Sequence, residues 1–433
     1  EFSNLETKLV LANKAYDNYL ASLPKQFSDR SEGEARAEAL REAKGLQETL
    51  RELGNGTVAL YTVVSEDRYH VILITPETQV PFTYDIKAAD LNQKVEEFRS
   101  VLTNPRLDPV PLARELYRIL VGPVAAALDD AEAKTLMWSL DGALRYVPIA
   151  ALHDGRQYLV EKYDITMFTP ASHSRLERPA SAEWRGLGMG VSKGSHPLPY
   201  VRSELYGVIH DDSISNSGNG VISGKILLDD SFTKEAMKDA LQHGKGYSLV
   251  HVASHFRFTA GNEYDSYLLL GGSEQDSDEQ RHLSLAEIKS GTNIFHGVEL
   301  LTLSACNTAV GSGEGSEVEN FAVLAQLKGA SAVIATLWPV ADLSTMHLMQ
   351  NFYRLHGEHP EQTKIESLRQ AQLSLLHGCS GGECGQTGPS ALPFEADSDP
   401  NQGAHTTGFH PDSRAPYAHP YFWAPFVLMG NWR

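Results

Sequence analysis

YSLVHVASH, residues 247–255, and VELLTLSACNTAVG, residues 298–311, are the two stretches that decide the fold. Each begins with apolar and β-branched residues and ends in small or polar ones, which is typical of a strand buried on both faces of a parallel sheet. Ligands and catalytic groups collect at the carboxyl ends of such strands. The reactive side chains at these two ends, His255 and Cys306, are therefore the first candidates for chemistry.

His255 and Cys306 form a candidate catalytic dyad. A cysteine attacks as the thiolate, and a neighbouring imidazole lowers its pKa. The two residues lie 51 positions apart, which leaves room for a hairpin-like segment and a short helix in a crossover between neighbouring strands. A cysteine after a buried strand is more often inert, so the pair alone supports only a hypothesis. His251 falls inside the first strand, and we expect it to be a core residue rather than a base.

Several longer strings resemble the CHAT proteases, relatives of caspases and separases in clan CD. They span roughly residues 116–432 in the order expected for that family: LDGALRYVPIAALHDGRQYLVEKY, HVASHF, DSYLLLGG, LLTLSACNTAVG, NFAVLAQLKGASAVIATLWPVADLST and HPYFWAPFVLMG. The resemblance implies an α/β fold with a caspase-like, mainly parallel sheet flanked by helices. A pseudo-caspase-like α/β half and N-terminal helices would precede it.

The same resemblance implies roles for individual residues. Cys306 would be the nucleophile of a cysteine endopeptidase and His255 its base. The backbone amides of Cys306 and Phe256 would stabilise the oxyanion. Many relatives have glycine after the histidine, so Phe256 departs from the family pattern. The sequence therefore leaves open whether the Phe256 N–H reaches the oxyanion.

Four further residues are candidates for substrate binding. Ser304 stands where some arginine-specific relatives have an acidic side chain. Val340, Ala341 and Asp342 follow the strand-like run SAVIATLW, in a loop that pairs with substrate backbone in caspase-like folds. Asp342 could accept a basic P1 side chain, but it also has the residue type and position of a helix N-cap. We therefore expect only that the P1 residue is not acidic.

Composition and charge set the class of protein. The 433 residues are 42% hydrophobic and 21% charged, as in soluble globular proteins of two or three domains. No run of eighteen apolar residues predicts a membrane span. With 37 basic and 55 acidic residues the net charge is −18, which argues against nucleic acid as the main partner.

Three cysteines in the whole chain indicate a reducing compartment and exclude a disulfide framework. We expect a cytoplasmic protein without a cofactor. The chain begins at Glu1 rather than Met, so the natural N-terminus is expected to be missing. Cys379 and Cys384, near His377, lack a second cysteine pair, and this argues against a zinc site.

The pattern along the chain predicts three parts. Residues 1–55 are expected to form a helical segment, 56–180 a pseudo-caspase-like α/β subdomain, and 181–433 the catalytic subdomain with a flexible insertion at about 378–418. CHAT domains often follow tetratricopeptide helices, and a sensor or a protein containing such repeats is therefore an expected partner. No period of 34 residues occurs in this chain.

Short periodic runs predict the individual elements. Three strands, 57–64, 69–76 and 79–86, should form an antiparallel meander. Further predicted strands and helices follow in this order: helices 87–102 and 112–128; strands 135–140, 146–151, 158–163, 165–168 and 184–192; helix 202–209; strand 225–228; helix 232–241; helices 318–328, 343–355 and 362–376; and a final strand, 419–430, that closes the sheet. The glycine-rich run 311–320 lacks the Lys-Ser/Thr of a phosphate loop, and a mobile loop is expected there.

Two classes of function remain. In the first, the chain is a cysteine endopeptidase that cleaves a specific protein partner and is regulated by a sensor or ligand, in a bacterial defence or signalling system. In the second, the same fold is a catalytically silent scaffold that transmits a signal by docking. Cleavage assays on the intact chain and on variants of the two dyad residues would separate them.

Overall fold

The computed structural model describes residues 45–433 except 55, 169–175, 177–182, 195–196, 215–217, 244–245, 260–261, 273–275, 292, 305–315, 379–407 and 411. It describes no side chain at 243, 278 and 316–320. The predicted helices of residues 1–44 therefore lie outside the described residues. Residues 45–53 form a helix whose Leu46 and Leu50 are buried.

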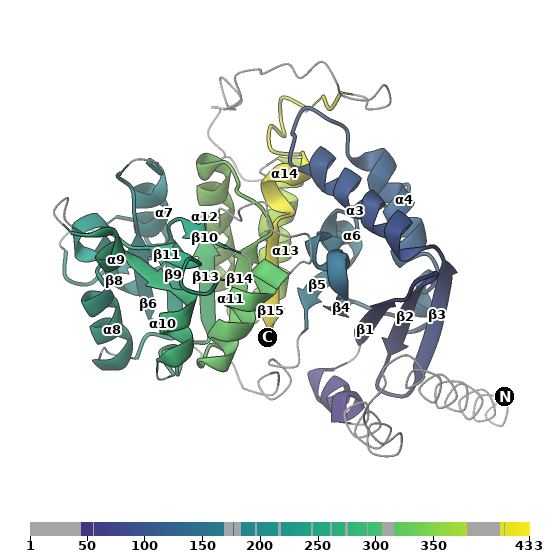
Figure 1. Cartoon of the computed structure of the whole chain (residues 1–433), viewed down its shortest axis with the longest axis horizontal. Coiled ribbons are helices and arrows are strands. Elements are labelled where there is room, and N and C mark those ends of the chain that lie inside the picture. Colours follow the sequence, from purple (N-terminus) through teal and green to yellow (C-terminus); the bar gives the residue numbers. More distant parts are fainter. Residues whose placement is uncertain are drawn as a thin grey trace.

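A sheet of twelve strands runs through the described part of the chain, in the order β3-β2-β1-β4-β5-β15-β14-β13-β9-β6-β8-β7 (Figure 1). Most neighbouring strands are parallel, and the antiparallel pairs are β1 with β2, β2 with β3, and β14 with β15. The strands are β1 Thr57–Val64, β2 Arg68–Ile74, β3 Gln79–Asp85, β4 Thr135–Ser139, β5 Asp164–Met167, β6 Gly186–Gly190, β7 Ile209–Asp211, β8 Ile222–Leu228, β9 Leu249–Ala253, β13 Leu300–Ser304, β14 Ala332–Thr336 and β15 Phe426–Gly430.

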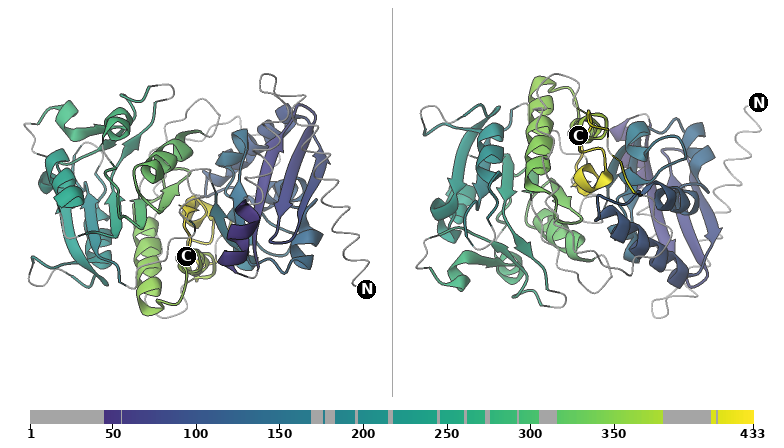
Figure 2. Two further views of the ribbon diagram at one scale, coloured as in Figure 1. Left: turned by 90° about the horizontal axis from the view of Figure 1, so that it is seen from below. Right: turned by 90° about the horizontal axis from the view of Figure 1, so that it is seen from above.

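Helices lie on both faces of this sheet (Figures 1 and 2). A second sheet, β10-β11-β12, lies between β9 and β13 in sequence. Its strands are β10 Phe256–Arg257, β11 Tyr267–Leu269 and β12 His282–Ser284. The helices are α3 Ala88–Leu102, α4 Val110–Leu120, α5 Ala125–Asp130, α6 Leu159–Lys162, α7 Val201–Val208, α8 Lys234–His243, α9 Asp278–Arg281, α10 Leu285–Ser290, α11 Ser316–Leu327, α12 Asp342–Glu358, α13 Lys364–His377 and α14 Pro420–Trp423.

The central strands are buried on both faces. Every residue of β9, β13, β14 and β15 is buried, as their continuous apolar sequences require of a sheet covered by helices on both sides. The predicted fold class, α/β with a mainly parallel sheet flanked by helices, is confirmed.

The last strand of the chain joins the two halves of the sheet. β15 pairs antiparallel with β14 and parallel with β5, and the hydroxyl of Thr166 donates to the carbonyl of Leu428 at 2.9 Å. The strands β1, β4 and β5 therefore run opposite to β9, β13 and β14. The C-terminal strand was expected to close the sheet, and it lies in its middle instead.

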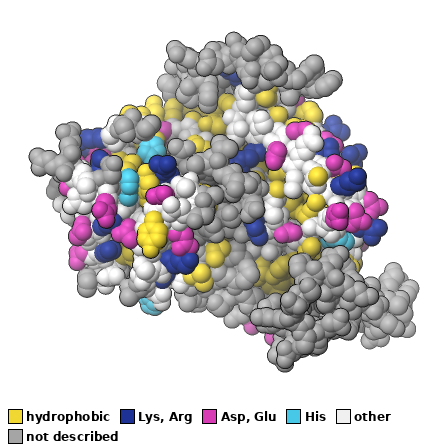
Figure 3. Space-filling model, viewed as in Figure 1, with side chains coloured by type: hydrophobic (Ala, Val, Ile, Leu, Met, Phe, Trp, Pro, Cys, Tyr) yellow, Lys and Arg dark blue, Asp and Glu magenta, His cyan; other side chains and the backbone are white. Residues whose placement is uncertain are grey.

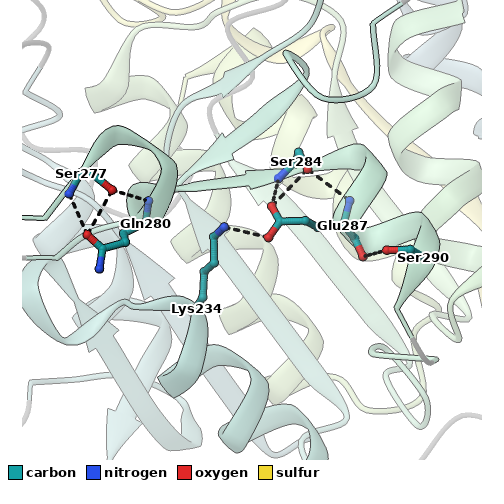
Figure 4. A network of polar contacts seen from close by, with 6 residues as sticks. All are labelled: Lys234, Ser277, Gln280, Ser284, Glu287 and Ser290. Atoms are coloured by element: carbon teal, nitrogen blue, oxygen red, sulfur yellow. Dashed lines mark hydrogen bonds and ion pairs between the residues drawn. The ribbon is translucent and has the colours of Figure 1, made fainter.

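Capping residues fix several helix starts. Figure 4 shows Ser284 and Glu287 at the start of α10, where the Ser284 N–H donates to the Glu287 carboxylate at 2.9 Å and the Glu287 N–H donates to the Ser284 hydroxyl at 3.2 Å. This is a capping box. Lys234 of α8 donates to the same carboxylate at 2.8 Å and so links α8 to α10.

Most predicted elements are confirmed, including the meander β1-β2-β3, but four predictions are wrong. Two 3₁₀ turns, Gly142–Tyr146 and Ile149–Ala151, replace the strand predicted at 146–151. The strand predicted at 158–163 is α6, Leu159–Lys162, where the Glu161 carboxylate accepts from the Tyr158 N–H. The predicted helix 112–128 is divided into α4 and α5 by a turn at 121–124; this turn contains Gly122 and Pro123, which disfavour a continuous helix. The first part of 419–430 is α14, because Pro420 can occupy the first turn of a helix.

The predicted insertion at 378–418 is described only at its ends. Its central residues 379–407, with Cys379 and Cys384, lie outside the described residues. At the C-terminal end of the insertion, the Phe409 N–H donates to the carbonyl of Arg106 at 2.8 Å, and Gly408 forms an antiparallel β-bridge with Leu107. This end of the insertion therefore lies against the connection between α3 and α4.

Gly224 offers a test of the sheet packing. A Cβ at Gly224 would overlap the carbonyl oxygen of Gly186 on the neighbouring strand β6. We expect Gly224→Ala to lower the free energy of unfolding in urea by about 1–3 kcal/mol. Gly357 in α12 is the matched control, because a Cβ there meets only Val221 at 4.0 Å. Gly357→Ala should raise stability by up to about 1 kcal/mol, and equal effects of the two changes would contradict this packing.

Candidate functional site

The strands that precede His255 and Cys306 are neighbours. β9 and β13 pair in parallel with Ala253 opposite Ser304, and the Ser254 N–H donates to the carbonyl of Ser304 at 3.2 Å. The two strands thus end side by side at one edge of the sheet, which places half-buried His255 at that edge. Cys306 lies outside the described residues, so its distance from His255 stays a prediction.

The backbone N–H of Phe256 points away from the neighbouring strand β11. The His255 carbonyl accepts a hydrogen bond from the Leu269 N–H at 2.8 Å, and Phe256 faces Leu268 in the next position of the antiparallel pair. Hydrogen-bonded and non-hydrogen-bonded pairs alternate in such ladders, so the Phe256 N–H points away from β11. In the described part of the chain, β10 is an edge strand, so no strand of this sheet pairs with the Phe256 N–H.

A phenylalanine is compatible with this backbone. Among the described residues other than glycine, positive φ occurs at Glu132 and Asp229, so position 256 does not require glycine. The Phe256 ring is buried and packs edge-on against Phe321 of α11, with 5.1 Å between ring centroids. The departure from the family pattern thus adds a core contact beside His255.

The predicted substrate-binding residues occupy two different environments. Ser304, the last residue of β13, is buried, and its hydroxyl has no hydrogen-bond partner among the described residues. Val340 and Ala341 are half-buried and lie in the loop between β14 and α12. The preceding Trp338 is buried, and its indole N–H donates to the carbonyl of Tyr421 at 3.1 Å.

Asp342 binds the start of another helix. The N-cap of α12 is Ala341, without a side-chain cap, and Asp342 is the first helical residue. Its interpretation as the N-cap is therefore wrong. The carboxylate instead accepts a hydrogen bond from the Tyr200 N–H at 2.8 Å, immediately before α7. Burial raises the pKa of Asp342 to about 6, with Glu204 also raising it and the Tyr200 hydrogen bond lowering it.

A chain of buried polar groups lies beneath this edge of the sheet. His251 Nε2 is 2.8 Å from Glu204 Oε1, and His251 Nδ1 is 3.0 Å from the Tyr353 hydroxyl. The Tyr353 hydroxyl is 2.7 Å from the Thr302 hydroxyl. All four side chains are buried, so the expectation that His251 is a core residue is confirmed. The chain of contacts connects β9 and β13 to α7 and α12.

The role of Asp229 was not evident from the sequence. This buried residue has a φ of 51°, and its carboxylate accepts hydrogen bonds from the N–H and hydroxyl of Ser192 at 2.7 and 2.8 Å. Positive φ is uncommon for residues other than glycine, and aspartate and asparagine are among the residues that tolerate it best. Asp229 follows β8 directly, and its hydrogen bonds with Ser192 hold the chain just after the end of β6. An aspartate directly after an apolar strand was the available signal.

The family model of the CHAT domain matches residues 110–431, about three quarters of the chain. The chain belongs to the CHAT domain family. The family assignment made from the sequence strings is thereby confirmed, and the matched region includes both β9 and β13 and the loop that contains Asp342.

Two solved structures illustrate what this chain is similar to. The separase–securin complex of Saccharomyces cerevisiae has 11% identity and a TM-score of 0.46, and it covers 78% of this chain and 30% of the separase chain. The Arg-specific cysteine proteinase gingipain R has 12% identity and a TM-score of 0.39, covering 79% of this chain and 74% of that one. This CHAT chain thus spans less than a third of the separase chain. The comparison with curated proteins found no match.

The described part of this CHAT domain contains no candidate metal site. Within the described ranges, no group of three or more His, Cys, Asp or Glu side chains is arranged to bind a metal ion. His377 Nε2 lies 3.3 Å from a Glu161 carboxylate oxygen.

None of the helices described is long and apolar enough to cross a membrane. On the face in Figure 3, acidic and basic side chains are interspersed over the described surface.

His251→Met tests the buried polar chain. The change leaves the Glu204 carboxylate buried without its partner, so we expect the free energy of unfolding to fall by about 3–5 kcal/mol. Tyr353→Phe removes one hydroxyl and should cost less, about 1–3 kcal/mol. Urea denaturation measures both. A His251→Met chain as stable as the unchanged one would rule out a structural role for this contact.

Asp342→Asn tests the raised pKa. Because the folded-state pKa of about 6 exceeds the ordinary value near 4, ionisation of Asp342 costs stability as the pH rises through about 6. Asparagine keeps the acceptor for Tyr200 without this cost. The stability advantage of Asp342→Asn should therefore grow from pH 4.5 to 7.5 in urea titrations.

Asp412→Asn is the matched control for that pH series. Its hydrogen bonds with Arg414 lower the pKa of exposed Asp412 to about 2. Asp412 is therefore ionised throughout the range from pH 4.5 to 7.5, and the effect of its replacement should not change with pH. A parallel course for the two variants would refute the raised pKa of Asp342.

Proposed function

We propose that this chain is a cysteine endopeptidase with His255 and Cys306 as its catalytic dyad. The observation that supports this most directly is the parallel pairing of β9 with β13, with Ala253 opposite Ser304. His255 and Cys306 each follow these paired residues by two positions. Two residues of chain span at most about 7 Å, and we infer from this that the thiol can reach the imidazole. Membership of the CHAT family adds to this support.

In the proposed reaction, His255 takes the proton of the Cys306 thiol, and the resulting thiolate attacks the carbonyl carbon of the scissile peptide. The oxyanion accepts hydrogen bonds from the N–H groups of Cys306 and Phe256. When the tetrahedral intermediate collapses, the C–N bond breaks, and the imidazolium protonates the leaving amine. Water then hydrolyses the thioester, with His255 again acting as the base.

The proposed substrate is a specific protein with a P1 residue that is not acidic. Val340 and Ala341 would pair with the extended substrate backbone, and Ser304 and Asp342 would line the approach to the S1 pocket. The Asp342 carboxylate is partly buried. Among the described residues, the negative charge of Glu204 also raises the pKa of Asp342. An approaching acidic side chain would add repulsion here, whereas a cationic one would stabilise the ionised carboxylate.

The proposed organisation assigns catalysis to residues 181–433 and support to residues 56–180. The segment 1–55 would connect the catalytic part to a sensor or to tetratricopeptide helices. Regulation by such a partner fits a bacterial defence or signalling system and a cytoplasmic location. All three cysteines lie in the proposed catalytic part, so the preceding part cannot supply the thiol.

Replacement of the dyad residues tests the proposal. The intact chain should cleave a candidate partner protein or fluorogenic peptides, and Cys306→Ala and His255→Ala should each lower kcat/KM by about 10³-fold or more. A cysteine-directed electrophile should modify Cys306, as mass spectrometry of the labelled peptide would show. Cys379→Ala and Cys384→Ala are matched controls that remove a thiol outside the dyad, and their activity should be unchanged.

Two results would contradict the peptidase. One is cleavage that persists in both dyad variants. The other is an intact chain that neither cleaves nor reacts with the electrophile in the presence of its activator, and this result would favour the docking scaffold. A peptide-library profile dominated by P1 aspartate would contradict the proposed S1 preference alone.

A further inference from the structure

Arg99 reaches from the first half of the chain to the end of β14. This residue lies on α3, and its guanidinium donates to the carbonyl of Leu337 at 3.2 Å. The guanidinium carbon also lies 4.3 Å from the centre of the Tyr146 ring. The planar guanidinium can stack on an aromatic ring while it donates in its own plane, so Tyr146 restricts the direction in which Arg99 donates.

Leu337 begins the post-β14 segment, residues 337–342, which connects β14 to the first residue of α12. The Leu337 N–H donates to the carbonyl of Pro425 at 3.0 Å, while the Leu337 carbonyl accepts from Arg99. Trp338 donates from its indole to Tyr421. The post-β14 segment is therefore fixed at its start by α3 and by residues 421–425.

The other end of the post-β14 segment is bound to the second half of the chain. The Asp342 carboxylate accepts from the Tyr200 N–H at 2.8 Å, at the start of α7. Between the two fixed ends, Pro339 is exposed and Val340 and Ala341 are half-buried. The segment thus runs between contacts from opposite halves of the chain, with its exposed residues in the middle.

We propose that Arg99 is a positioning residue for substrate binding. It orients the Leu337 peptide, and this sets the backbone of Val340 and Ala341 against the substrate. The first half, which lacks a cysteine, thereby determines the substrate affinity of the second half. This inference rests on the proposed function, since it assigns those two residues to the substrate backbone.

Arg369 provides a matched comparison within the same chain. This arginine of α13 also donates from one half to backbone carbonyls of the other, to Val160 at 2.6 Å and Glu161 at 2.7 Å. Arg369 and Arg99 are therefore alike in charge and in donating to backbone carbonyls, although Arg369 Nη1 also lies 3.9 Å from Asp164 Oδ1. They differ in that Arg99 contacts the post-β14 segment, whereas the Arg369 acceptors lie in and near α6.

Amide hydrogen exchange tests the positioning role without any need for activity. We expect Arg99→Met to accelerate exchange at the amides of 338 and 340–342 by about tenfold, the effect of losing one charge-assisted hydrogen bond. Arg99→Lys should give an intermediate rate, because lysine keeps the charge but not the planar fork. Arg369→Met should leave these amides unchanged. Equal rates at these amides in Arg99→Met and Arg369→Met would overturn the proposal.

Kinetics on fluorogenic tetrapeptides with Arg, Lys, Ala or Asp at P1 provide the second readout. Arg99→Met should raise KM by about five- to tenfold and keep kcat within about twofold, since it alters binding rather than the dyad. Arg369→Met should change neither. An unchanged KM in an active Arg99→Met chain would overturn the positioning role. An intact chain that neither cleaves a substrate nor reacts with the electrophile in the presence of its activator would instead refute the peptidase, and the exchange rates would still decide whether Arg99 orients the segment.

Discussion

The parallel pairing of β9 with β13 is the interaction on which the proposed site depends. It brings Ala253 and Ser304, the last residues of the two strands, to the same edge of the sheet, although 51 positions separate them in sequence. The buried contacts among Glu204, His251, Tyr353 and Thr302 fix the two strands against α7 and α12. Because these polar groups satisfy one another away from water, a shift of one strand past the other would leave several of them unpaired.

The C-terminal strand makes the two halves of the chain a single structure. β15 pairs with β5 on one side and with β14 on the other, so the strand that completes the second half also continues the sheet into the first. Arg99 and Arg369 add hydrogen bonds between the halves. A change in the first half therefore has a direct physical route to the segment after β14.

In the proposed S1 region, the Asp342 carboxylate makes a structural contact and would also take part in recognition. Asp342 binds the backbone N–H of Tyr200, at the amino end of α7 where negative charge is favourable. Burial nevertheless raises its pKa to about 6. A cationic neighbour stabilises a partly buried carboxylate more than it stabilises an exposed carboxylate, because less water competes for the buried one.

The sequence by itself determined the α/β class, the family and most of the buried strands, since continuous apolar runs such as LLTLS and AVIAT have few alternatives to a sheet covered on both faces. It also identified His251 as a core residue from its position within a strand. It failed at 158–163 and 419–430, where aromatic and apolar residues fit either a short helix or a strand and the contacts of the folded chain decide between them. Only the tertiary structure placed β15 between the halves, Asp342 against Tyr200 and Arg99 against Leu337, because strand order and contacts between residues far apart in the chain leave no local pattern in the sequence.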